Sequence, residues 1–107
     1  MGDAAAVASH LIKVEPENEA WWIGLAYSIR RSEGVEKAEA ILLRAQAIHP
    51  KVAMIAFNLA CYASVTGRME EAKKRLSDAI ALDKDIRELA IDDEDLKPLW
   101  DWVADLE

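Results

Sequence analysis

The side chains best suited to chemistry in this chain are two histidines, one cysteine and a run of acids at residues 92 to 95. His10 and His49 are isolated, and no pair formed by these histidines and Cys61 has the spacing of metal ligands. The acidic run "DDED" lacks the alternating oxygen ligands and the turn glycine of a calcium-binding loop. Phosphate-binding loops and nucleophile elbows are also missing from the sequence. We therefore expect no enzymatic activity, no metal and no cofactor.

The charge of the chain is concentrated near its C-terminus. Residues 1 to 82 contain ten acidic and ten basic residues, whereas residues 83 to 107 contain ten acidic and three basic ones, which accounts for the net charge of -7. This distribution argues against nucleic acid and anionic membranes as partners, because both attract basic patches. A single cysteine excludes an intramolecular disulfide, and no run of eighteen apolar residues occurs. We expect a soluble, cytoplasmic protein.

The helices that would position these side chains repeat at a fixed interval along the chain. This interval is the distance in sequence between Pro16 and Pro50. Apolar residues recur at helical spacing in residues 19–50 and, one interval later, in residues 53–84. The pattern predicts two helix–turn–helix segments. Their paired positions are Trp22 with Ala56, Leu25 with Leu59, Ala26 with Ala60, Ile29 with Ala63, Ala38 with Ala72, Leu42 with Leu76 and Ala45 with Ala79.

This period, with small and large apolar residues at fixed places, resembles the tetratricopeptide repeat (TPR), whose unit is about 34 residues long. The chain departs from the family pattern at Ala26 and Ala60, which replace a glycine, at Ala56, which replaces a tryptophan, and at Lys84, which replaces the closing proline. The resemblance implies an all-α fold, a right-handed superhelical array of antiparallel helix pairs (an α-solenoid). It also implies one TPR-like domain over residues 1–107, divided into an N-terminal half repeat (4–16), repeat 1 (19–50), repeat 2 (53–84), and a partial repeat with a C-terminal capping helix (85–107).

Local signals predict where the helices begin and end. Asn18 is placed to cap a helix that begins at Glu19 and ends near Arg31. Further helices are expected over residues 35–48, 53–65 and 69–82, and a last one from about residue 95. The turn glycines Gly34 and Gly67 are one place closer together than the repeat interval, so the first turn is expected to be atypical. The last helix would present Leu96, Leu99, Trp100, Val103 and Leu106 on one face, and the outer side of 69–82 would carry the ion pairs Glu70–Lys74 and Glu71–Arg75.

The function that the resemblance implies is binding of a peptide or helix of a partner protein. In this family, the first helices of successive repeats line a concave groove. By helical position the groove here would be an apolar strip with a basic edge. Tyr27, Phe57 and Met54 would anchor apolar side chains, and Arg30 or Arg31 would pair with an acidic side chain or a C-terminal carboxylate. The residues expected to bind the peptide are Ile23, Tyr27, Arg30, Arg31, Met54, Phe57, Asn58 and Cys61.

Other interpretations of the same strip remain open at this point. The C-terminal helix or a second copy of the protein could fill it, which would make Tyr27 and Phe57 ordinary core or dimer contacts. The chain could then be a self-associating structural module or a fragment of a larger scaffold. A small chaperone for a secreted substrate is a further alternative. The partner is therefore a protein or peptide of unknown identity, with a homo-oligomer as one possibility.

Overall fold

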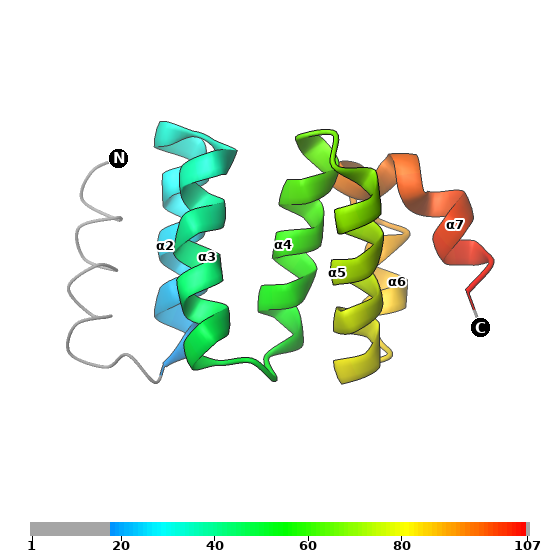
Figure 1. Cartoon of the computed structure of the whole chain (residues 1–107), viewed down its shortest axis with the longest axis horizontal. Helices are drawn as coiled ribbons and strands as arrows, with labels where there is room; N and C mark the ends of the chain where they lie inside the picture. Colours follow the sequence, from blue (N-terminus) through cyan, green and yellow to red (C-terminus); the bar gives the residue numbers. More distant parts are fainter. Residues whose placement is uncertain (1–17, 107) are drawn as a thin grey trace. The chain divides into compact units, whose positions relative to one another are not determined.

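The computed structural model describes residues 18–106, and every regular element within them is helical. The all-α class expected from the sequence is thus confirmed for this part of the chain. The half repeat expected at residues 4–16 lies outside the described residues. The elements, drawn in Figure 1, are α2 (Glu19–Glu33), α3 (Val35–Ile48), α4 (Ala53–Val65), α5 (Met69–Leu82), α6 (Ile86–Ala90), the 3₁₀ helix η1 (Glu94–Leu99) and α7 (Trp100–Ala104).

The chain divides into two compact units, residues 1–51 and residues 52–107. This division falls between the two repeats that the sequence predicts. The first unit contains the antiparallel hairpin of α2 and α3, and the second contains the antiparallel hairpin of α4 and α5 followed by α6, η1 and α7 (Figure 1).

In the first unit, α2 starts at a capped N-terminus and buries one side against α3. The side chain of Asn18 accepts a hydrogen bond from the backbone nitrogen of Ala20 at 3.1 Å, as the capping signal predicts. The Arg44 guanidinium lies 5.4 Å from the centre of a Trp22 ring, so it covers the aromatic side chain. The core of this hairpin consists of Trp22, Leu25 and Ala26 from α2 and Ala38, Leu42 and Ala45 from α3.

The second hairpin buries the same positions of the repeat. Leu42 of α3 and its equivalent Leu76 of α5 are both completely buried. Ile29 is the exception, since it is partly exposed while its equivalent Ala63 is buried. The repeat seen in the sequence is therefore also a repeat in packing. The equivalent buried residues of the second hairpin are Ala56, Leu59, Ala60, Ala72, Leu76 and Ala79.

The first turn is atypical, as the glycine spacing predicts. The predicted end of α2 near Arg31 was wrong, because α2 continues to Glu33 and only Gly34 separates it from α3. In the second hairpin, three residues around Gly67 separate α4 from α5. Both glycines have positive φ, +107° and +82°, a conformation that other residues rarely adopt. Gly34 lies one place later in its repeat than Gly67, so α2 extends further before the chain reverses. The other boundaries of the first four helices agree with the prediction.

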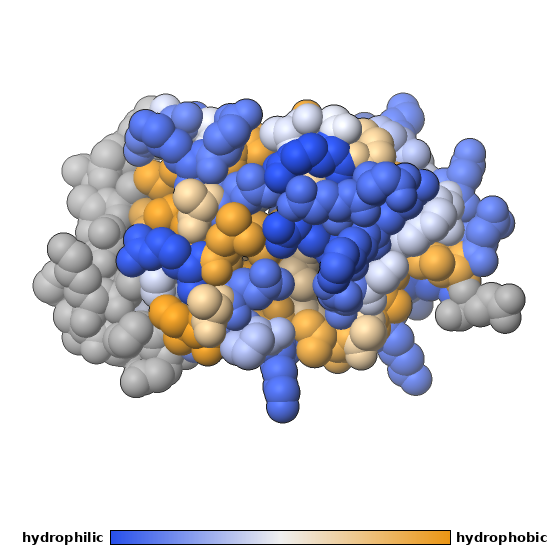
Figure 2. All heavy atoms as spheres, viewed as in Figure 1, coloured by the Kyte–Doolittle hydropathy of each residue, from blue (hydrophilic) through white to orange (hydrophobic). Residues whose placement is uncertain are grey.

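The outer side of α5 is charged and solvated, and hydrophilic residues gather over it in Figure 2. The predicted pair Glu71–Arg75 is present, with a shortest distance of 2.7 Å. The predicted pair Glu70–Lys74 was wrong. Glu70 instead lies 3.5 Å from Lys73, and Lys74 lies 3.2 Å from Asp78, because long side chains reach either helical neighbour.

The predicted C-terminal helix from residue 95 was also wrong in form. The chain makes the 3₁₀ helix η1 and then one turn of α-helix, α7. Asp93 caps η1 by accepting a hydrogen bond from the Asp95 amide at 2.9 Å. Pro98 lies inside η1 and has no N–H to donate, which disfavours a continuous α-helix. The inward face is nevertheless largely as predicted, since Leu96, Leu99 and Val103 are buried.

Candidate functional site

One side of α2 carries four of the residues expected to bind a peptide. Ile23, Tyr27, Arg30 and Arg31 are spaced four, three and one places apart, which puts them on a common side of the helix beside its buried side. We call these four residues the α2 face. Tyr27 exposes 61% of its surface, and Arg31 is also exposed. Ile23 and Arg30 are partly exposed.

Tyr27 and Arg31 contact each other on the α2 face. The Nη1 of Arg31 donates a hydrogen bond to the Tyr27 hydroxyl at 3.1 Å, and the guanidinium lies 5.6 Å from the ring centre. The pair therefore holds a planar cation beside an exposed aromatic surface. Arginine binds carboxylates through two parallel hydrogen bonds, and tyrosine offers apolar contact area at low entropic cost. The α2 face can thus hold an acidic group next to an apolar side chain.

The other four expected residues lie on α4 and have different environments. Met54 exposes 39% of its surface and Asn58 is partly exposed. Phe57 and Cys61 are buried, with only 5% and 2% exposed. They are the equivalents of Ile23 and Tyr27 in the second repeat. The same two positions are therefore buried on α4, whereas on α2 Ile23 is partly exposed and Tyr27 is exposed.

In the second unit, one side of α4 is covered by the C-terminal segment, the name that we give to η1 and α7 together. Phe57, Cys61 and Ser64 follow one another at helical spacing, and we call them the α4 face. Ser64 is 4% exposed, and its hydroxyl donates a hydrogen bond to the backbone carbonyl of Asp95 at 2.7 Å. The packing of η1 on α4 therefore covers the strip at Cys61 and Ser64, whereas Met54 stays exposed and Asn58 partly exposed. At Cys61 and Ser64 the chain's own C-terminal segment occupies the strip, as in one of the alternatives expected from the sequence.

The same junction brings together one thiol and two carboxylates that sequence reasoning did not connect. One ligand atom each of Cys61, Asp93 and Asp95 lies within 4.8 Å of the other two. Thiolate and carboxylate are zinc ligands, but a structural zinc site has four donors, and this group offers three within the described residues. One Asp93 oxygen already accepts the Asp95 amide hydrogen bond, so the group also serves the turn that starts η1. No spacing rule finds this group, because Cys61 is separated from the two acids by more than thirty residues.

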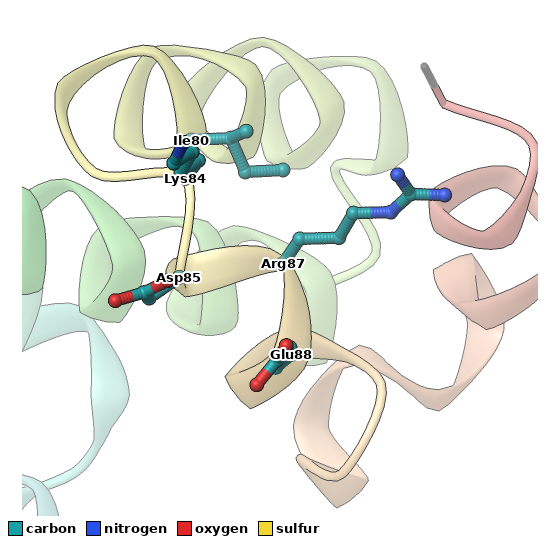
Figure 3. A pocket seen from close by; sticks show the side chains of 5 residues that line it. All are labelled: Ile80, Lys84, Asp85, Arg87 and Glu88. Carbon is teal, nitrogen blue, oxygen red and sulfur yellow. The ribbon is translucent and has the colours of Figure 1, made fainter.

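An open hollow of about 430 Å³ lies between the end of α5 and α6 (Figure 3). Ile80 forms its apolar part, and Lys84, Asp85, Arg87 and Glu88 line the rest. Arg87 extends toward α7, where its Nη2 donates a hydrogen bond to the Ala104 carbonyl at 3.0 Å. One of the two cations that line this hollow, Arg87, therefore helps to hold the C-terminal segment.

Comparison of the chain with protein-family models, with curated proteins and with solved structures gave no match. Within residues 18–106, none of the helices has the length and apolar character needed to cross a membrane.

Proposed function

We propose that this protein is a protein–protein interaction module of the TPR type, which binds a peptide or helix of a partner through the α2 face. In this proposal the hairpins belong to a right-handed superhelical array, and the module acts in the cytoplasm by binding rather than by catalysis. The repeated packing of the two hairpins supports the repeat architecture. The observation that carries the functional part is the exposed Tyr27–Arg31 pair.

The Tyr27–Arg31 pair is not needed for the packing of its own hairpin. The α2 side of that core consists of Trp22, Leu25 and Ala26, while Tyr27 remains 61% exposed. Tyrosine and arginine are among the residue types that most often dominate binding energy at protein interfaces. An exposed aromatic–cation pair is therefore well suited to contact a partner.

The experiment is affinity capture from a native lysate with the wild-type chain and the double variant Tyr27→Ala, Arg31→Ala. We expect the double variant to retain at least about tenfold less of the partner, since loss of an interface hot spot costs about 2 kcal/mol or more. The matched control is Leu43→Ala, which truncates a side chain that is 42% exposed on α3. This control should retain the partner as the wild type does.

Circular dichroism and thermal melting separate binding from folding in this experiment. Both altered residues are exposed, so the free energy of unfolding should change by less than about 1 kcal/mol. Equal capture by wild type, control and double variant would refute a role for the α2 face.

A further inference from the structure

In the second unit, η1 packs on α4 in the manner of a short peptide ligand, and α7 packs on η1 and α6. Leu96 and Leu99 of η1 and Val103 of α7 point inward, and they expose 2% or less of their surfaces. The backbone carbonyl of Asp95 accepts the Ser64 hydrogen bond, which fixes the segment along α4. The segment thus combines apolar residues at spacings of three and four with an acidic N-terminal end.

The α2 face is the equivalent, in the first repeat, of the α4 face, on which this segment packs at Cys61 and Ser64. Ile23, Tyr27 and Arg30 correspond to Phe57, Cys61 and Ser64. On α4 these positions are buried, with 5% exposure or less, whereas Tyr27 of α2 is 61% exposed. The position that Cys61 and Tyr27 share in the repeat is therefore covered in the second unit and exposed to solvent in the first.

The charge of the α2 face is complementary to a segment of this kind. The carboxylates of Asp93 and Asp95 lie beside Cys61 on α4, and the equivalent place on α2 is Tyr27. Where α4 has Val65, α2 has Arg31, so an acidic end would meet a guanidinium group. Electrostatic attraction should therefore be stronger on α2 than it is on α4.

We propose that the α2 face binds an acidic segment of a partner protein with two leucines at a spacing of three, of the kind that η1 presents to α4. This inference rests on the proposed function and names the class of partner. A second copy of this chain is a poorer occupant, because its C-terminal segment already packs on its own α4. Releasing that segment would expose Leu96, Leu99 and Val103.

The test uses a fluorescein-labelled peptide of residues 92–106, DDEDLKPLWDWVADL, titrated with the full chain at low salt. We expect saturable binding by fluorescence anisotropy. Binding should weaken by at least about tenfold in the Tyr27→Ala, Arg31→Ala variant and stay unchanged in Leu43→Ala. A peptide with Leu96→Ser and Leu99→Ser should lose binding as well, because its charge is the same but its apolar contacts are gone.

A charge swap provides a second variant that does not depend on Tyr27. Arg31→Glu should weaken binding of the original peptide at least about tenfold. A peptide carrying Asp93→Lys and Asp95→Lys should bind this variant better than it binds the wild type. Recovery of this kind requires direct contact between the acidic end and the α2 face, so its absence would overturn the proposal.

Three other outcomes would also overturn it. No peptide binding, combined with lysate capture that still depends on Tyr27, would keep the proposed function and reject this class of partner. Peptide affinity that is unchanged in the Tyr27→Ala, Arg31→Ala variant but higher in Ser64→Ala would show that the peptide displaces η1 from α4 instead. A dimer detected by light scattering and removed by Tyr27→Ala would assign the α2 face to a second copy.

Discussion

Individual charged residues of this protein differ mainly in how much solvent surrounds them. The pair Lys74–Asp78 is largely exposed, with side-chain exposures of 77% and 57%, so it contributes little to stability. Glu71 is less exposed and contacts two cations, Arg75 at 2.7 Å and Arg68 at 3.1 Å. Arg75 is only 19% exposed, which reduces solvent screening of this interaction. Glu71 is therefore the acid whose charge state matters most on α5.

The first prediction concerns the pH dependence that Glu71 causes. The hydrogen bond from Arg75, with the charges of Arg75 and Arg68, lowers the pKa of Glu71 below its usual value of 4.5, although desolvation opposes this. A carboxylate with a lowered pKa stabilises the fold above its unfolded pKa, and the effect is lost as pH falls through the folded pKa. Glu71→Gln should therefore reduce the free energy of unfolding at pH 7, by less than about 1 kcal/mol because the site is partly solvated.

Urea unfolding at pH 7 and at successively lower pH values measures this difference. The gap between wild type and Glu71→Gln should close as the pH falls below 4.5. Glu70→Gln is the matched control, because the Glu70 side chain is 92% exposed and should show almost no gap at any pH. A gap for Glu71→Gln that persists in acid would contradict the electrostatic explanation.

The second prediction uses the glycines of the helices and turns. Gly24 lies inside α2, and a Cβ built there would meet nothing within 4 Å. Gly24→Ala should raise the free energy of unfolding by up to about 1 kcal/mol, because alanine loses less backbone entropy in a helix. Gly67→Ala is the contrasting variant and should lower it, since φ at Gly67 is +82°. Thermal melting followed by circular dichroism measures both changes. A lower melting temperature for Gly24→Ala would mean that the added methyl group clashes with a neighbouring group on this side of α2.

Among the helical elements, those of the second unit depend on the attachment of the C-terminal segment to α4. Four polar contacts and several buried apolar side chains hold this segment. One of the four is the hydrogen bond from Arg87 to the Ala104 carbonyl, and of the four the Ser64 bond is the one that comes from α4. The Nε1 of Trp100 donates to the carbonyls of Ala90 and Asp93 at 3.0 and 3.2 Å, and Ser64 donates to the carbonyl of Asp95. Nine residues of α4 are buried, which is more than packing against α5 on one side of the helix can bury. A second side of α4 must therefore also pack against another part of the unit.

The third prediction is that Ser64→Ala loosens η1 from α4. The change removes the donor for the Asp95 carbonyl, and loss of one partner of a part-buried hydrogen bond costs about 1–3 kcal/mol. Hydrogen exchange should accelerate first in residues 94–104 and less in α5. Ser77→Ala, at an exposed position of α5, is the control and should leave exchange unchanged. Equal acceleration in both variants would show that the hydrogen bond does not anchor the segment.

Across the whole molecule, contacts divide the chain into two units of similar length that bury equivalent residues. Each hairpin has its own completely buried leucine, Leu42 in the first and Leu76 in the second. The charge is divided less evenly, because residues 83–107 carry the whole net charge of -7. The two units thus share a packing pattern and differ in their surfaces.

The fourth prediction compares the two leucines. Leu42→Ala and Leu76→Ala each remove a buried side chain of the same size, so each should cost about 2–5 kcal/mol. Hydrogen exchange should accelerate mainly in residues 18–51 for the first variant and in residues 52–106 for the second, because each leucine packs within its own unit. Uniform acceleration along the chain in both variants would show that the molecule opens as one cooperative unit.

Most of the helices and of their buried positions could be predicted from the sequence. Helical periodicity, caps and turn glycines act between residues that are close in the chain, so the boundaries of α3, α4 and α5 follow from local pattern. The repeat interval then predicts equivalent core positions in the two hairpins, such as Leu42 and Leu76, because equivalent positions pack in the same way.

Which of the equivalent surfaces are covered depends on packing between segments that are far apart in the chain. In the sequence, Tyr27 and Cys61 occupy the same place in the repeat, and both were expected to line one strip. In the structure Cys61 is buried beside Asp93 and Asp95, while Tyr27 is exposed with Arg31. The difference arises because η1, which follows α4 by about thirty residues along the chain, packs on α4. Such long-range packing depends on the combined shape of both surfaces, which no local pattern in the sequence records.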